Sequence, residues 1–240
     1  TAGVVVGHLD GASATTIDLH TLASNNDGKP NCDGAYAVGS DLYVTCGDLN
    51  DNDMNLPALT VGKIVVIDTT TDTVRTTIDM PVKNPTGAIV QHGTDLIMPT
   101  YGATTGCTVK VTTGATPTAT CLFMNSDLHA QTNNDGDIGG TMQSLDIKGD
   151  VLWFGYSDAF FSGGWARSYD LATSTLQPNL SPDSQSIHDV AACPDGKIAV
   201  TEGAFGAAGG FRVYSGTAEL TADAIPLGLA PSFGGGLTCY

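Results

Sequence analysis

Two short β-forming segments follow one another in the sequence KIVVIDTTTDTVRTTIDM, which spans residues 63–80. Lys63–Asp68 is rich in β-branched residues, and in Val74–Met80 polar residues separate the apolar ones. Val, Ile and Thr favour strands, and an alternating pattern is typical of a strand with one buried face. The Thr-Thr-Thr-Asp segment between them is polar and suits a turn. The sequence therefore predicts a β-hairpin over residues 63–80.

The same hairpin pattern recurs along the chain at intervals of roughly 40 to 55 residues. It groups the sequence into four units of four short strands, each strand separated from the next by polar turn residues. The units cover 33–46 with 63–68 and 74–80; 86–98 with 107–113 and 118–123; 140–147 with 150–156, 165–171 and 175–180; and 188–192 with 197–202, 210–215 and 219–225. Four-stranded units at this spacing are typical of propeller blades.

The two ends of the chain complete this pattern. Residues 3–8 and 15–19 match the third and fourth strands of a unit, and residues 234–239 match a first strand. We therefore predict an all-β fold, a single β-propeller domain over residues 1–240 with five blades, whose ring is closed by N- and C-terminal strands sharing one blade. One strand of that shared blade is missing, so either it is three-stranded or the chain is a fragment of a longer protein.

Composition narrows the function classes. The chain has 25 acidic against 9 basic residues, a formal charge of −16, and only two of the acidic residues, Glu202 and Glu219, are glutamate. Such a surface repels nucleic acid and anionic lipid, so neither is an expected partner. The longest apolar runs have four or five residues, too short for a membrane span. Aspartate, 30 Gly and 11 Pro favour turns over helices.

Six cysteines indicate an oxidising compartment. Cys107 and Cys121 flank the turn 114–117, and Cys32 and Cys46 flank the turn 39–41, so each pair falls across two antiparallel strands. Cys193 and Cys239 remain as a long-range pair. Three disulfides predict a secreted, periplasmic or cell-surface protein, whereas the alternative is six buried free thiols. The chain begins at Thr1 without a leader pattern, which we interpret as a processed or truncated product.

The hairpin at 63–80 also carries a family resemblance. Together with Pro85-Thr-Gly-Ala-Ile-Val90 and Asp95-Leu-Ile-Met98, it resembles the YVTN-type β-propeller repeat. The likeness is specific over about 63–101 and weak elsewhere, and the cysteine pairs and the inserts at 47–62 and 124–138 depart from it. The resemblance implies an extracytoplasmic propeller that acts as a binding or scaffold module. Some relatives with similar repeats are lyases or metal-dependent hydrolases, so the fold does not exclude chemistry.

A calcium site is one hypothesis for the insert that follows Cys46. Asp48, Asn50, Asn52 and Asp53 supply closely spaced oxygen atoms, and Ca²⁺ takes six to eight oxygen ligands. The loop lacks the Gly and the Glu that an EF-hand requires. The alternative interpretation is a solvated surface loop rich in Asx turns.

A second candidate site lies where the first strands of the predicted blades begin, near the ring axis. The residues at these entries are Asp33, Thr86, Asp137 with Gly139, His188 with Asp189, and Ser232. Converging carboxylates and a histidine could bind a metal or act as a base. A hydrogen-bonded loop histidine is the commoner role for a residue such as His188. The phrase Asn-Asp-Gly at 26–28 and 134–136 lies on similar connections, and it is also a strong turn former.

Aromatic residues offer a third candidate. Phe160, Phe161 and Trp165 follow the strand 150–156 in or near a connecting loop. An exposed aromatic loop could stack on a sugar or anchor a protein partner, and packing between blades is the alternative. We therefore expect an exported, non-catalytic binding or scaffold propeller that contacts a protein or glycan, with structural Ca²⁺. The alternatives are a metal-dependent lyase or hydrolase using the axial Asp and His residues, and a subunit of a larger extracellular assembly.

Overall fold

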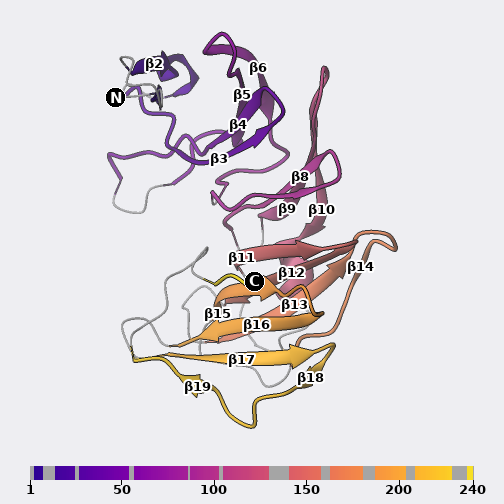
Figure 1. Cartoon of the computed structure of the whole chain (residues 1–240). Helices are drawn as coiled ribbons and strands as arrows, with labels where there is room; N and C mark the ends of the chain where they lie inside the picture. Colours follow the sequence, from indigo (N-terminus) through magenta and orange to yellow (C-terminus); the bar gives the residue numbers. More distant parts are fainter. Residues whose placement is uncertain are drawn as a thin grey trace. The chain divides into compact units, whose positions relative to one another are not determined.

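The computed structural model shows a chain made almost wholly of short antiparallel strands (Figure 1). The residues that it describes are 3–7, 14–24, 27–53, 57–85, 87–102, 105–129, 141–157, 163–180, 187–203, 209–228 and 237–239. Two short helices accompany the strands in these ranges, the 3-10 helix η1 (His20–Leu22) and the α-helix α1 (Asn125–His129). Neither helix is long enough to span a bilayer, and no other helix occurs in the described ranges.

The strands form one two-stranded sheet and four larger sheets. The two-stranded sheet pairs β1 (Gly3–Val6) with β2 (Thr15–Asp18). The first larger sheet runs β3 (Cys32–Val38), β4 (Asp41–Cys46), β5 (Lys63–Asp68), β6 (Thr73–Asp79), and the second runs β7 (Val90–His92), β8 (Asp95–Pro99), β9 (Cys107–Thr112), β10 (Thr118–Met124). The third runs β11 (Thr141–Lys148), β12 (Val151–Ser157), β13 (Gly164–Asp170), β14 (Thr175–Leu176). The fourth runs β15 (Ile187–Ala192), β16 (Lys197–Glu202), β17 (Gly210–Ser215), followed by β18 (Ala218–Glu219) and β19 (Ile225–Pro226), which both pair with β17.

These four sheets confirm the predicted division into four-stranded units, with one difference in the last. The predicted outer strand over 219–225 is split into β18 and β19. In the intervening segment 220–224 the Leu220 N–H still donates to the Val213 carbonyl of β17, but the residues form no strand and include the turn-favouring Asp223. Of the predicted strand over 234–239, residues 237–239 are described, and they are not in a strand.

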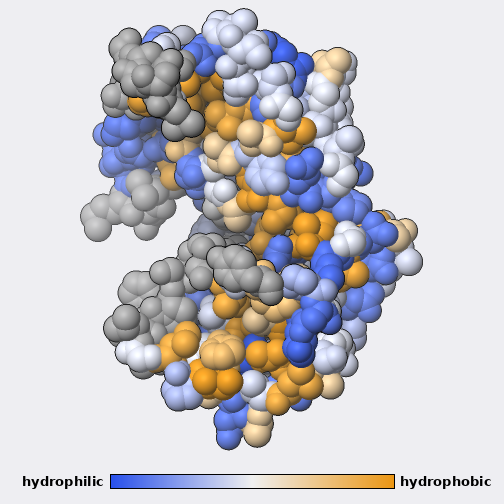
Figure 2. All heavy atoms as spheres, viewed as in Figure 1, coloured by the Kyte–Doolittle hydropathy of each residue, from blue (hydrophilic) through white to orange (hydrophobic). Residues whose placement is uncertain are grey.

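The described residues gather into two compact units. The first comprises residues 1–89, 94–101 and 107–121, and the second comprises residues 90–93, 102–106 and 122–240. In the first unit the hairpin of β5 and β6 forms as predicted. Ile64, Val65, Val66 and Ile67 are at most 1% exposed, whereas the outer strand β6 is largely exposed and carries the pale and blue side chains seen in Figure 2. Burying this branched run contributes much of the apolar driving force.

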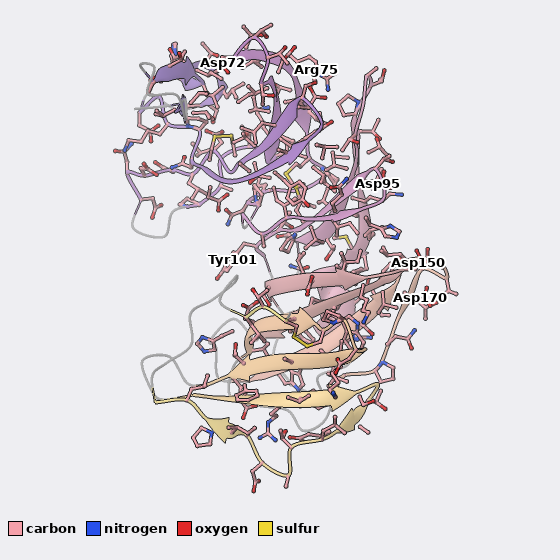
Figure 3. All side chains as sticks on the ribbon, viewed as in Figure 1. Asp72, Arg75, Asp95, Tyr101, Asp150 and Asp170 are labelled. Atoms are coloured by element: carbon pink, nitrogen blue, oxygen red, sulfur yellow. A yellow bond between two sulfur atoms is a disulfide. The ribbon has the colours of Figure 1, made fainter. Side chains whose placement is uncertain are left out.

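The core of the first unit extends to the N-terminal sheet. Ile17 and Leu19, with Val4 and Val6, pack against side chains of the first larger sheet, namely Val44, Val65 and Ile67. The core of the second unit lies between its third and fourth sheets, where Ala166, Leu180, Ile187, Val190, Ile198, Val200 and Tyr214 cluster. The chain joins the predicted cysteine pairs, Cys32–Cys46, Cys107–Cys121 and Cys193–Cys239 (Figure 3).

Candidate functional site

Several connections between strands meet at one end of the first unit. Alternate connections of an antiparallel meander fall at the same end, and here these are the segments before β3, between β4 and β5, after β6 and after β8. Backbone hydrogen bonds join neighbouring segments, from Gly62 to Val82 and from Tyr101 to Asn84. We call this surface the loop face and define it as residues 24, 27–31, 47–53, 57–62, 80–85 and 100–101.

Asp48 is a buried residue of the loop face, and its side chain connects two of the segments. It is 2% exposed, and its φ of +47° lies in the left-handed region that Asp and Asn tolerate best among residues with a side chain. One carboxylate oxygen accepts the Ser24 N–H at 3.0 Å, and the other accepts the hydroxyls of Ser24 at 2.5 Å and Thr60 at 2.8 Å. Burial favours the neutral acid, but these hydrogen bonds outweigh it, so the pKa of Asp48 is lowered. The ionised carboxylate thus ties the 47–62 insert to the segment before β3.

A second set of contacts fastens the same two segments together. The side-chain amide of Asn31 donates to Asp51 at 2.8 Å, and its carbonyl oxygen accepts the Leu49 N–H at 2.9 Å. Lys29 Nζ lies 2.9 Å from the other Asp51 oxygen. The hydrogen bond from Lys29, followed by that from Asn31, lowers the pKa of Asp51. The insert is therefore held in one conformation by several polar contacts.

The predicted calcium ligands of this insert have different roles. Both oxygens of Asp48 point at Ser24 and Thr60. Asn50 forms an Asx turn, because its side-chain oxygen accepts the Asn52 N–H at 3.2 Å, and Asp53 donates its N–H to the Asn50 carbonyl at 3.1 Å. The turn thus brings Asn50, Asn52 and Asp53 together at the tip of the insert. Among the described residues, no group of three or more His, Cys, Asp or Glu side chains could hold a metal ion.

Two large apolar side chains are exposed on the loop face. Tyr101 is 45% exposed and is labelled in Figure 3, and Leu59 is 36% exposed. Their backbones are fixed, since Tyr101 donates its N–H to Asn84 at 2.7 Å and Leu59 donates its N–H to Asp48 at 2.9 Å. Lys83 Nζ donates to the Leu59 carbonyl at 3.2 Å. Nothing in the local sequence pattern indicates that Tyr101 and Leu59 are exposed on a loop that hydrogen bonds hold in place.

The predicted axial residues fall in both units. Asp33, in the first unit, accepts the Thr45 hydroxyl at 3.3 Å, and desolvation of its carboxyl raises the pKa of Asp33. In the second unit Asp189 is 3% exposed and accepts the N–H groups of Val190 at 2.9 Å and Leu237 at 2.7 Å. His188 is 2% exposed, with Nε2 3.0 Å from the Gly203 carbonyl oxygen. Both side chains thus contact backbone groups of the second unit. Thr86, Asp137, Gly139 and Ser232 lie outside the described residues.

Of the three aromatic candidates, Trp165 is among the described residues. Phe160 and Phe161 lie outside the described residues. Trp165 is the second residue of β13 and is only 7% exposed, with its ring centroid 5.5 Å from that of Tyr156. It belongs to a buried cluster of Phe123, Phe154, Tyr156, Trp165 and Tyr169. Trp165 is therefore a core residue of β13, where the predicted strand 165–171 places it, and not an exposed residue of the connecting loop.

Asp27 and Gly28 of the first Asn-Asp-Gly phrase lie in a turn, as one of the two interpretations of the phrase predicted. The Asp27 side chain accepts the Lys29 N–H at 2.8 Å, and Gly28 has a φ of +66°. The second phrase, at 134–136, lies outside the described residues.

Comparison with known proteins bears on the fold. No family model matches the sequence, and no curated protein sequence matches it. The YVTN-type resemblance therefore stays a prediction. Several solved structures are similar in fold. The Dos1 propeller has a TM-score of 0.58 at 10% identity over 93% of this chain and 56% of that chain.

Two further solved structures are also similar in fold to this chain. Hydrazine synthase of Kuenenia stuttgartiensis has a TM-score of 0.53 at 16% identity over 92% of this chain and 63% of that one. The exo-β-1,3-galactanase 1,3Gal43A of Clostridium thermocellum has a TM-score of 0.50 at 7% identity over 87% of this chain and 51% of that one. The chain thus spans less than two thirds of the length of each. At such low identity the likeness concerns the fold alone, and it shows that the chain has an all-β, β-propeller-like fold built of antiparallel four-stranded sheets.

Proposed function

We propose that the protein is an exported, non-catalytic binding or scaffold propeller that contacts a protein or glycan partner through its loop face. The observation that carries this proposal is the combination of exposed Tyr101 and Leu59 with loops that the buried Asp48 and the surface residue Asp51 hold in place. Fixed loops lose little conformational entropy on binding, and exposed aromatic rings are frequent anchors of protein and sugar contacts.

The proposed location follows from the disulfides. Three disulfides in a chain of 240 residues indicate an oxidising environment. Secretion, a periplasmic location and display on the cell surface all satisfy this condition. Because a galactanase is among the similar structures, galactans and other glycans belong in the first screen beside extracellular proteins.

A matched pair of variants tests the loop face. The immobilised chain is screened against a glycan array and an extracellular protein library, and hits are measured by surface plasmon resonance. Tyr101→Ala should weaken a true hit about 30-fold, the size expected for loss of a hot-spot residue of about 2 kcal/mol. Val74→Ser is the control, because Val74 is 41% exposed on the outer strand β6 of the same unit. Equal affinities for the wild type and Tyr101→Ala would assign the partner to another surface.

We also propose that the tip of the insert binds Ca²⁺ through Asn50, Asn52 and Asp53. Oxygen atoms of side chains and backbone carbonyls at one turn suit this hard ion. Native mass spectrometry before and after EDTA is the direct measurement. A mass higher by one calcium that is lost with chelator, and absent in Asp53→Ala, supports the site. A calcium adduct retained by Asp53→Ala would place the ion elsewhere.

We further propose that the ring has five blades and is closed by segments from both ends of the chain. The β1–β2 sheet packs its apolar side on the first larger sheet, as a neighbouring blade would. In the second unit the Cys193–Cys239 disulfide and the Leu237 N–H to Asp189 bond attach the C-terminal residues to β15 and its following turn. A closed ring should sediment as a monomer, whereas dimers would favour a blade completed by a second chain.

A further inference from the structure

The Cys193–Cys239 disulfide borders a cavity in the second unit. The cavity has a volume of about 410 Å³ and is lined by both cysteines together with Pro194, Asp195, Lys197, Ala199 and Val213. Ala199 and Val213 are paired residues of β16 and β17, so one wall is the face of the fourth sheet. Small-molecule pockets in proteins have volumes of about 300–1,000 Å³. A small thiol can therefore reach this disulfide without unfolding the sheet.

We propose that Cys193–Cys239 is a thiol-exchange site, at which a small dithiol reduces this disulfide before the other two and thereby releases residues 237–239. The attacking thiolate of the dithiol forms a mixed disulfide with Cys239, and Cys193 Sγ leaves as a thiolate. The second thiolate of the reagent then displaces Cys239 and closes the reagent into a cyclic disulfide. The protein gains two electrons, the dithiol loses two, and its two thiol protons end on the cysteines.

The surroundings of Cys193 favour it as the leaving group. Lys148 Nζ donates to the carbonyl oxygens of Cys193 and Pro194, and Lys197 lies on the same turn. Asp195 pairs with Lys197 and offsets its charge, so Lys148 supplies the net positive charge. A cation near a cysteine favours its thiolate. The turn also keeps Cys193 in place after cleavage, because the Cys193 N–H donates to the Lys197 carbonyl at 2.8 Å.

The other two disulfides each join two neighbouring antiparallel strands. Cys32 and Cys46 are directly opposite residues of β3 and β4, and Cys107 and Cys121 lie on the neighbouring strands β9 and β10. One partner of each pair is buried, since Cys46 is 1% exposed and Cys107 is 0% exposed, whereas Cys32 is exposed and Cys121 is half-buried. Strand pairing keeps these thiols adjacent after reduction, so they reclose readily. By contrast, Cys239 is not in a strand.

The number of residues between the two cysteines also favours reduction of Cys193–Cys239 before the other two disulfides. The separation is 46 residues for Cys193–Cys239 against 14 for each of the other pairs. The length dependence of loop closure alone makes the effective concentration of the longer pair about sixfold lower. We therefore expect Cys193–Cys239 to open at a dithiol concentration at least about sixfold below that needed for the hairpin pairs.

Reduction also changes the environment of Asp189. In the disulfide-bonded protein this 3% exposed carboxylate accepts the Leu237 N–H at 2.7 Å. Release of residues 237–239 removes that donor and opens the cavity wall formed by Cys239. The exchange thus couples a redox event to exposure of the fourth sheet.

Differential alkylation of the intact protein tests the proposal. The chain is equilibrated with graded dithiothreitol, quenched with N-ethylmaleimide and mapped by mass spectrometry, while far-UV circular dichroism confirms that the fold persists. Cys193 and Cys239 should be labelled first, and hydrogen exchange of the Leu237 amide should rise with that labelling. The Cys193→Ser/Cys239→Ser variant should show the fast Leu237 exchange without reductant, whereas Cys107→Ser/Cys121→Ser should not. Labelling of either hairpin pair at the same or a lower dithiol concentration would overturn the proposal, and this outcome needs no variant to fold.

Discussion

Replacing Asp48 should loosen the loop face more than replacing any exposed aspartate of the same unit. Asp48→Ala removes an ionised acceptor of three hydrogen bonds, two from Ser24 and one from Thr60. Hydrogen bonds to charged groups contribute about 1.5–3 kcal/mol each, and bonds in one network are not additive. A left-handed backbone at φ +47° costs Ala about 1 kcal/mol more. We expect a total local destabilisation of about 3–5 kcal/mol.

Asp48→Asn removes the negative charge of the side chain but keeps its size and shape, so it measures the effect of the charge alone. Asn tolerates the same backbone conformation and keeps one acceptor oxygen, so its cost should be about 1–2 kcal/mol. Asp79→Asn is the control, since Asp79 forms an exposed ion pair with Lys63 at 2.7 Å that contributes at most about 1 kcal/mol. The lowered pKa of Asp48 adds a pH signature. Its stabilisation is present above the ordinary value of 3.8 and is lost as the pH falls through the lower folded-state pKa.

Hydrogen exchange read by mass spectrometry suits this test better than fluorescence. Both tryptophans, Trp153 and Trp165, lie in the second unit, so their emission reports on the wrong part of the chain. The amides of Ser24 and Leu59 donate to Asp48, one to its side chain and the other to its backbone. Each 1.4 kcal/mol lost locally should raise their exchange about tenfold. An unchanged exchange rate of the Ser24 amide in Asp48→Ala would refute the conclusion that Asp48 holds the segments of the loop face together.

Two other perturbations address the second unit. A Cβ on Gly155 would lie 2.2 Å from Ile187 Cγ2, so Gly155→Ala should cost about 1–3 kcal/mol in a urea titration followed by tryptophan fluorescence. Ile187→Ala should recover part of that loss in the double variant, and strictly additive costs would contradict the clash. Burial raises the pKa of both Tyr156 and Tyr214 to about 12. Because this exceeds the ordinary value of 10, their stabilisation is present below pH 10 and lost as the pH rises towards 12, and phenolate absorbance should show Tyr156 and Tyr214 ionising late.

The strand pattern was predictable from the sequence because it depends on neighbouring residues. Branched runs such as Lys63–Asp68 and the polar turns after them are local signals, and they located all four larger sheets. The hairpin cysteine pairs were predictable for the same reason, since each pair flanks a turn. The outer strand of the last sheet broke at residues 220–224, where two pairing segments are separated by a turn that the pattern does not reveal.

The candidate site depends on contacts between residues that are far apart in the sequence. Less of it than of the strand pattern could therefore be predicted. Asp48 looked like an ion ligand because it stands among other oxygen-bearing residues. Its actual partner Ser24 is 24 positions upstream, and no local pattern connects the two. Likewise, the position of Trp165 next to a connecting loop suggests an exposed ring, whereas its contact with Tyr156 across two paired strands buries it. Side-chain environment is set by tertiary packing, which a single sequence does not display.

The two hairpin disulfides have a consequence for proteolysis. Each encloses an exposed turn, Gly39–Ser40 within the Cys32–Cys46 pair and Gly114–Thr116 within the Cys107–Cys121 pair. Loop tips of this kind are preferred sites of proteolytic nicking. A protease that cuts there leaves two fragments joined by a covalent bond and by the surrounding strands. The nicked chain should keep its sheets and migrate as fragments only after reduction.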